Sequence, residues 1–145
     1  MTDSVTDSVT DYEKFLPEIT PLHEPFWAAL REHRVELQRC DRCGRFRFIP
    51  RELCPCGSAQ YTWTPIAGTG EVYTYTVVHR APTPAYQADA PYVIAHVTMD
   101  EGPRMISTLV GCEPTRVLIG MPVEIAFDDV TPDLTLYRFR PSERR

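Results

Sequence analysis

The amino-acid sequence predicts a mainly β protein, in which an N-terminal helix and a metal-stapled β ribbon precede a five-stranded barrel. Three observations support this fold class. Four of the five cysteines cluster together, alternating apolar and aromatic runs follow them, and 14 prolines against 7 glycines disfavour long helices. A length of 145 residues suffices for one compact domain beside a small module. The expected segments are an acidic lead-in (1–19), a helix (20–33), a ribbon (34–64), a barrel domain (65–141) and a tail (142–145).

The lead-in repeats Thr-Asp-Ser-Val and is too polar to bury a core, so we expect it to be disordered. It has neither the basic stretch nor the apolar centre of a signal peptide, and no run in the chain approaches the ~18 apolar residues that span a bilayer. We therefore expect a cytoplasmic protein without a membrane segment. The net charge of −5 disfavours a general nucleic-acid-binding role.

A helix is expected over residues 20–33, where Thr20 can act as the N-cap and Pro21 fits the first turn. One face of this helix carries three large apolar side chains, Phe26, Trp27 and Leu30. Such a stripe is typical of a protein core or of a protein–protein interface. Because the helix is short and precedes a small module, we predict that these residues contact a partner protein.

Two pairs of cysteines have the spacing of a metal site. Cys40 and Cys43 lie in Cys-Asp-Arg-Cys-Gly, and Cys54 and Cys56 lie in Cys-Pro-Cys-Gly-Ser. A Cys-x-x-Cys pair followed by Gly forms a tight turn that aims both sulfurs at one point, and two such pairs give tetrahedral S4 coordination. The second pair is one residue shorter than the usual spacing. The pattern predicts a structural zinc in a rubredoxin-like zinc ribbon.

A disulfide framework and four merely buried or free thiols are the alternatives to zinc. A reducing cytoplasm favours metal over disulfides, and the ribbon has too few apolar residues to fold without a metal. The fifth cysteine, Cys112, ends an apolar run and is expected to be a small buried hydrophobe.

The ribbon also carries six arginines, at positions 34, 39, 42, 45, 47 and 51. They form either a solvated surface or a patch for phosphate or for an acidic partner, because the planar guanidinium group suits both ligands. The sequence leaves both interpretations open.

Five strands are expected after residue 65, where runs rich in β-branched and aromatic residues alternate with turn signals. The expected strands are 71–78, 92–99, 105–110, 123–127 and 134–139. A long proline-rich connection joins the first two, and a short helical segment over 113–119 separates the third from the fourth. This arrangement is typical of an OB-type barrel, since Greek-key sandwiches of other kinds contain more strands.

The order of these motifs resembles the acyl-CoA-associated zinc-ribbon/OB-fold family over residues 20–140. The motifs that match best are Pro50-Arg51, Cys54-Pro55, Cys56-Gly57-Ser58 and Ile119-Gly120-Met121-Pro122-Val123. Together they are specific, although none is so alone. The chain departs from the family pattern at the second cysteine pair, where the usual Cys-Pro-x-Cys has lost a residue.

The resemblance implies a small non-catalytic partner of a thiolase-like enzyme, such as a ketothiolase, a C-acyltransferase or a steroid side-chain aldolase. In such a hetero-oligomer of lipid or steroid metabolism, the enzyme supplies the catalytic residues and the ribbon/OB protein helps to form the acyl-CoA site. We predict that His79, Arg80 and Tyr86 of the long connection contact that substrate, with a plain surface loop as the alternative. The rival functions are a single-stranded nucleic-acid-binding protein, disfavoured by the few basic residues of the barrel, and a free-standing enzyme, for which no catalytic constellation is evident.

Overall fold

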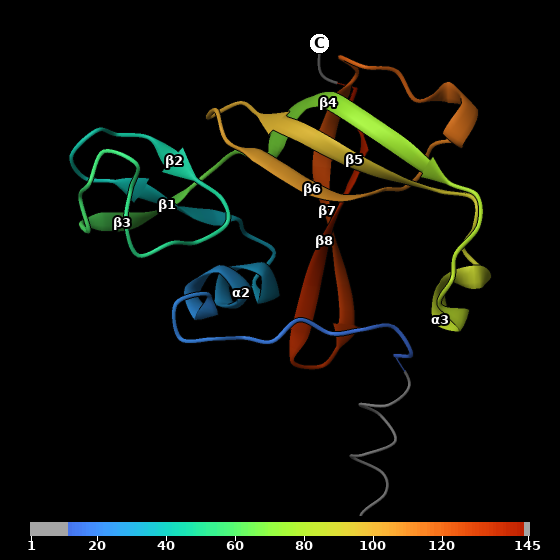
Figure 1. Ribbon diagram of the computed structural model, residues 1–145, viewed down its shortest axis with the longest axis horizontal. Coiled ribbons are helices and arrows are strands. Elements are labelled where there is room, and N and C mark those ends of the chain that lie inside the picture. Colours follow the sequence, from blue (N-terminus) through green and yellow to red (C-terminus); the bar gives the residue numbers. More distant parts are fainter. Residues whose placement is uncertain (1–11, 144–145) are drawn as a thin grey trace, which may run out of the picture.

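The computed structural model describes residues 12–143, which form a β ribbon and a β barrel with a helix packed beside them (Figure 1). The elements before the barrel are α2 (Glu24–Arg31), β1 (Glu36–Cys40), β2 (Phe46–Arg47) and β3 (Tyr61–Pro65). The barrel region contains β4 (Thr69–Val78), α3 (Pro84–Gln87), β5 (Tyr92–Met99), β6 (Arg104–Leu109), the 3₁₀ turn η1 (Pro114–Arg116), β7 (Pro122–Thr131) and β8 (Leu134–Pro141). The predicted fold class is confirmed. Over the described residues, none of the helices has the length and apolar character that crossing a membrane requires.

The ribbon is a sheet of three antiparallel strands in the order β2-β1-β3. The longer ladder joins β1 to β3, from Glu36 opposite Pro65 to Cys40 opposite Tyr61. The sequence predicted a ribbon over residues 34–64 but did not indicate β3 as a separate strand. Its Tyr-Thr-Trp-Thr-Pro run is short and only half-buried, so the run resembles a loop until β1 pairs with it.

The barrel closes in the order β4-β5-β6-β8-β7, and its only parallel contact among the described strands joins β6 to β8. In that contact Leu109 lies opposite Phe139. Gly70 lies where β4 comes very close to β5, because a Cβ atom at this position would be 2.4 Å from the Thr98 carbonyl oxygen. Glycine therefore allows β4 to pair with both β5 and β7 as the barrel closes.

Most barrel strands begin and end close to the predicted residues, and η1 lies within the predicted helical segment. The hairpin of β7 and β8 is longer than predicted, because Asp128 and Asp129 still pair with β8 beyond Phe127. This part of the hairpin extends out of the barrel toward α2 (Figure 1). It lies beyond the barrel interior, so it lacks the apolar alternation that identified the other strands.

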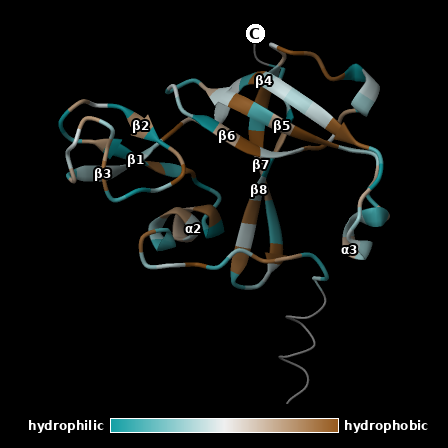
Figure 2. Cartoon of the chain, in the orientation of Figure 1, coloured by the Kyte–Doolittle hydropathy of each residue, from teal (hydrophilic) through white to brown (hydrophobic). Residues whose placement is uncertain are grey.

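Apolar side chains fill the barrel interior, and Figure 2 shows hydrophobic positions interspersed with hydrophilic ones along its strands. On β5, Val93, Ala95, Val97 and Met99 are buried and alternate with more exposed residues. Phe139 of β8 is fully buried among them. Since each large apolar side chain contributes ~1.5–3 kcal/mol when it is buried, this core holds the barrel together without a metal.

The helix α2 begins later than predicted. Thr20 starts a turn, in which its carbonyl accepts a hydrogen bond from the His23 N–H at 3.0 Å. The helix itself begins at Glu24, and Pro25 occupies the first-turn position that the sequence assigned to Pro21. The shorter helix packs against β8 and β1, and so it links the barrel to the ribbon.

The described part of the predicted lead-in lies against the barrel (Figure 1). Lys14 Nζ is 3.0 Å from the Asp89 carboxylate, and the ring of Phe15 lies 6.4 Å from that of Tyr86. Residues 14 and 15 thus contact the connection between β4 and β5, which the predicted disorder of residues 12–19 did not include. Residues 1–11 and the last two residues of the predicted tail lie outside the described residues.

Candidate metal centre and its surroundings

Four cysteine sulfurs converge at the free end of the ribbon. The Sγ atoms of Cys40, Cys43, Cys54 and Cys56 all lie within 4.8 Å of one another. Cys40 Sγ is 3.6 Å from Cys56 Sγ, and Cys43 Sγ is 3.5 Å from Cys54 Sγ. These separations exceed the ~2.05 Å of a disulfide and are close to the ~3.8 Å edge of a tetrahedron with Zn–S bonds of ~2.3 Å. The four thiols therefore fit a zinc ion.

The backbone of each cysteine pair turns sharply at a glycine. Gly44 follows the first pair at φ +77°, and its N–H donates to the Cys40 carbonyl at 3.0 Å. Gly57 follows the second pair at φ +95°, and its N–H donates to the Cys54 carbonyl at 2.8 Å. Glycine adopts this left-handed conformation without steric cost, which explains why Gly follows each pair. The shortened second pair still brings both of its sulfurs into the cluster.

Backbone hydrogen bonds and the crowding of the sulfurs shift the pKa values of Cys40, Cys54 and Cys56 in different directions. The backbone N–H of Cys43 lies 3.5 Å from Cys40 Sγ and lowers the pKa of Cys40 to about 6. The backbone N–H of Cys56 likewise lowers the pKa of Cys54. At Cys56 the backbone N–H of Ser58 favours the thiolate, but burial and the neighbouring sulfurs outweigh it and raise the pKa to about 11. Four thiolates at these distances therefore require a cation, which a divalent metal supplies.

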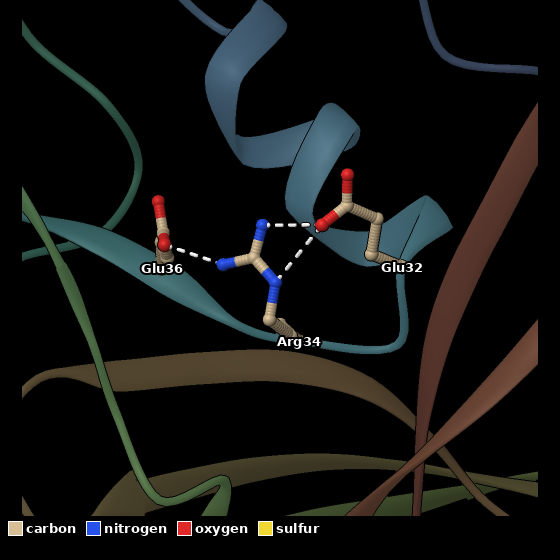
Figure 3. A network of polar contacts seen from close by, with 3 residues as sticks. All are labelled: Glu32, Arg34 and Glu36. Carbon is tan, nitrogen blue, oxygen red and sulfur yellow. Dashed lines mark hydrogen bonds and ion pairs between the residues drawn. The ribbon is translucent and has the colours of Figure 1, made fainter.

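One arginine fixes the connection between α2 and β1 (Figure 3). Arg34 Nη1 donates to Glu36 at 2.5 Å, and its Nε and Nη2 donate to Glu32 Oε1 at 3.1 and 2.7 Å. The hydrogen bonds to Glu32 and then to Glu36 hold the pKa of Arg34 above its ordinary value. This guanidinium group is therefore paired within the chain and does not belong to an open anion-binding patch.

The other ribbon arginines divide into engaged and open side chains. Arg39 Nε donates to the Gly44 carbonyl at 3.0 Å, and its guanidinium group lies 5.0 Å from the ring centre of Phe46. Three further arginines are exposed, and no described residue forms a hydrogen bond or ion pair with their guanidinium groups. These open side chains belong to Arg42, Arg45 and Arg51.

A buried polar pair joins β1 to β2 and to the segment before the second cysteine pair. Gln38 is fully buried, and its Oε1 accepts hydrogen bonds from Arg47 Nε at 2.8 Å and from the Arg51 N–H at 2.7 Å. Arg47 Nη2 donates to the Arg51 carbonyl at 3.0 Å. Sequence reasoning missed this pair, because a glutamine in an alternating strand resembles a solvent-facing residue. The direct pairing of Gln38 with Arg47 across the ladder brings them together.

The three residues predicted to contact a partner do not share one environment. Phe26 and Leu30 are buried, and the ring of Phe26 packs against those of Phe48 and Tyr137 at 5.5 and 6.0 Å. Their side chains therefore join helix, ribbon and barrel within the chain, which corrects the expectation that all three lie on the surface. Trp27 is only half-buried and remains available for contact.

Trp27 borders an apolar cavity of about 290 Å³ between α2, the ribbon and the barrel. Two of its walls carry exposed isoleucines, Ile49 from the ribbon and Ile106 from β6, which are 55% and 45% exposed. Tyr137 closes the barrel side, where its hydroxyl donates to the Ile106 carbonyl at 2.6 Å. Burial raises the pKa of Tyr137, so this hydroxyl stays neutral. Solvent thus reaches an apolar surface here.

The three residues predicted to contact substrate are also separated. Tyr86 lies on α3 and lines a cavity of about 380 Å³, together with Lys14, Asp89 and Arg138. His79 and Arg80 are exposed at the start of the same connection. The structure thus places Tyr86 at a concave surface but does not bring the other two residues to it.

Comparisons with known proteins cover both units of the chain. A family model described as the ChsH2 rubredoxin-like zinc ribbon domain matches residues 27–62, and one described as the ChsH2 C-terminal OB-fold domain matches residues 63–128. A solved structure described as an Ltp2-ChsH2(DUF35) aldolase has a TM-score of 0.78 and 40% identity, covering 87% of this chain and 98% of that chain. With the geometry of the four thiols, the zinc-ribbon match confirms the predicted structural zinc.

Two curated relatives are enzyme subunits whose chains are longer than this one. A probable enoyl-CoA hydratase alpha subunit of Thermomonospora curvata is 43% identical over 81% of this chain. The 3-oxo-4,17-pregnadiene-20-carboxyl-CoA hydratase alpha subunit of Mycobacterium tuberculosis is 34% identical over 81% of this chain. In each case the match spans 37% of the relative's length.

Proposed function

Because this chain belongs to the ChsH2 family of DUF35 zinc-ribbon/OB-fold proteins, we propose that it is a non-catalytic subunit that binds a thiolase-like enzyme. In the complex it helps to form the site for an acyl-CoA substrate whose carbon–carbon bond is cleaved or formed. The observation that carries this proposal is the likeness to the Ltp2-ChsH2(DUF35) aldolase, which covers 98% of the matched chain at 40% identity. The match to a steroid-type CoA hydratase subunit supports a bulky acyl-CoA as the substrate class.

The placement of the nucleophilic and basic side chains supports a non-catalytic role. The four clustered cysteines serve as metal ligands, and a closed S4 site leaves no open position for substrate. His33 is bound to Asp129 at 3.0 Å and stacks on the ring of Phe127, while His23 bonds to Thr20. Among the described residues, no hydrogen bond joins a histidine to Cys112 or to another cysteine. The chemistry is therefore assigned to the partner enzyme.

The apolar cavity beside Trp27 is the proposed contact surface for that enzyme. It combines an exposed aromatic side chain with isoleucines from two different units, which is the composition of an interface centre. The nucleic-acid alternative gains no comparable support. Arg138 and Arg140 of β8 are paired with Asp128 and Glu124, so their charges are not available for a phosphate backbone.

The test is co-purification with a thiolase-like enzyme, followed by acyl-CoA turnover measured for each protein alone and for the complex. We expect no turnover by this chain alone and full turnover only by the complex. Trp27→Ala should weaken the complex by ~2 kcal/mol or more, about 30-fold in Kd, without loss of zinc. Trp63→Ala, in the ribbon sheet, is the matched control and should leave the Kd unchanged. Turnover by the isolated chain, or equal losses from both tryptophan variants, would contradict the proposal.

A further inference from the structure

A further cleft lies at the junction of the ribbon and the barrel, and Phe48 separates it from the apolar cavity by lining both. It has a volume of about 270 Å³ and lies between β2, the segment that leads into Cys54, and the turn that begins β6. Four of its lining residues are arginines and none is acidic. The ribbon contributes three of them and the barrel one, so the cleft exists only when the two units are packed together. The arginines are Arg45, Arg47, Arg51 and Arg104.

The three exposed arginines of the cleft have no carboxylate partner among the described residues. Arg45 and Arg51 form no side-chain hydrogen bond there, and Arg104 lies over the ring of Tyr73 with its guanidinium carbon 3.6 Å from the ring centre. Stacking on a ring fixes the plane of a guanidinium group and leaves its N–H edge available to an acceptor. Elsewhere on the protein, Arg34 and Arg140 are bound to carboxylates. The cleft therefore concentrates uncompensated positive charge.

The fourth arginine adds a buried charge to the wall of the cleft. Arg47 is only 8% exposed, and two of its nitrogens donate to Gln38 Oε1 and to the Arg51 carbonyl. Its Nη1 has no hydrogen-bond partner among the described residues. A buried guanidinium group is normally paired with an anion, because an uncompensated buried charge is costly. The neutral oxygens around Arg47, and the ring of Tyr61 whose centre lies 4.9 Å from the guanidinium carbon, orient the group but carry no negative charge that would neutralise it.

We infer that this cleft binds a phosphate-class anion, either a phosphate ester or a pyrophosphate. Arginines contributed by two units line the cleft and can donate to the several oxygens of such an anion, and the cleft has room for a group of that size. The same chemistry is offered by a free inorganic anion and by the phosphate groups of a larger cofactor. The inference goes beyond the proposed function, since the isolated chain would bind the anion whether or not a partner enzyme is present.

The metal centre offers a competing explanation for the arginines. A zinc ion with four thiolates has a formal net charge of −2, and Cys54 lines the same cleft. If the arginines only balance that charge, their removal should lower zinc content and should not affect a separate ligand. If they form an anion site, their removal should weaken anion binding in a protein that keeps its zinc.

The experiment is calorimetric titration of the full-length, zinc-loaded protein with inorganic pyrophosphate, and zinc content is measured for every variant. We expect one bound anion per chain. Arg51→Gln and Arg104→Gln should each weaken binding about tenfold, which corresponds to the loss of one charge-assisted contact. Arg42→Gln is the matched control, because it removes the same charge from an exposed ribbon position outside the cleft, and it should change the affinity less than about twofold.

A second titration, with coenzyme A, identifies the source of the anion. If coenzyme A binds more tightly than pyrophosphate and competes with it, the cleft binds the phosphates of a nucleotide-bearing cofactor. If coenzyme A binds equally or more weakly, the cleft binds a free anion. An equal effect of Arg42→Gln, loss of zinc from the cleft variants, or no binding of pyrophosphate by the unchanged protein would each overturn the inference. Failure to bind a partner enzyme would leave this result untouched.

Discussion

The ribbon and the barrel reach stability by different physical means. In the ribbon, β2 has only 2 residues and the strands bury few apolar side chains, so four thiols around one zinc hold its loops in place. In the barrel, the strands have 6 to 10 residues and enclose a continuous apolar core. Metal binding therefore supplies the folding energy of the ribbon, whereas hydrophobic burial supplies that of the barrel. Substitutions that remove one contribution at a time test this difference.

The largest effect is expected from a metal ligand. Cys40→Ser removes one of four sulfurs, and structural zinc sites contribute apparent binding free energies of ~10–16 kcal/mol in small zinc peptides. We expect zinc content to fall from about one equivalent to near zero and residues 34–64 to lose amide-exchange protection, while the barrel keeps its protection. Cys112→Ser is the control, since its sulfur lies outside the metal cluster. If the ribbon keeps its amide-exchange protection without zinc, metal binding does not supply its folding energy and the proposed difference between ribbon and barrel is wrong.

The next effect is expected in the barrel core. Phe139→Ala empties a fully buried site and should lower the free energy of unfolding of the barrel by ~3–5 kcal/mol. Zinc content should not change in the fraction that remains folded. Ile119→Ala, at a side chain that is 68% exposed, should cost less than ~0.5 kcal/mol by the same denaturant measurement. If Phe139→Ala releases zinc before the barrel unfolds, the two units are not independent.

A smaller effect is expected from pH, and it acts on the ribbon alone. Because the pKa of Cys56 is raised to about 11 in the metal-free site, its thiol is protonated at neutral pH and must release a proton when zinc binds. The apparent zinc affinity should therefore rise by at least about tenfold per pH unit between pH 7 and 8. Cys40, whose pKa is lowered to about 6, adds to proton competition as the pH falls through that value. Titration against a chromophoric chelator measures the slope, and a pH-independent affinity would contradict the assignment.

The same difference decides how much of the molecule could be predicted from the sequence. The zinc ligands and β5 were predictable because cysteine spacing and apolar alternation are local signals. The buried pair of Gln38 and Arg47 was not, since only the ladder between β1 and β2 brings these polar residues together. The burial of Phe26 could not be predicted either, because it depends on helix, ribbon and barrel all packing around its ring. Local sequence patterns therefore do not predict the contacts between helix, ribbon and barrel. The candidate partner surface and the candidate anion cleft both lie at these contacts.

The smallest predicted effect concerns a contact that joins α2 to the barrel. His33 adopts a left-handed backbone at φ +59° and stacks on Phe127 with ring centres 4.8 Å apart. Its Nε2–H donates a hydrogen bond to the Asp129 carboxylate at 3.0 Å. The hydrogen bond from Thr135, and then the contact with His33, lower the pKa of Asp129. The carboxylate therefore stays charged near neutral pH.

We expect His33→Ala to lower the Tm of the barrel by no more than about 5 °C, because the histidine and its carboxylate partner are largely exposed. His33→Gly separates the two causes of this loss. Glycine removes the same ring contact but accepts the left-handed backbone freely, so it should be less destabilising than alanine at this position. Asp129→Asn keeps the stacking and removes the charge. Because the folded state lowers the pKa of Asp129, its deficit relative to the unchanged protein should be full at about pH 7 and should shrink toward about pH 3, where the carboxylate becomes protonated. A pH-independent deficit would assign the contact to stacking alone, and the helix segment and the barrel would then be joined here by packing without an electrostatic contribution.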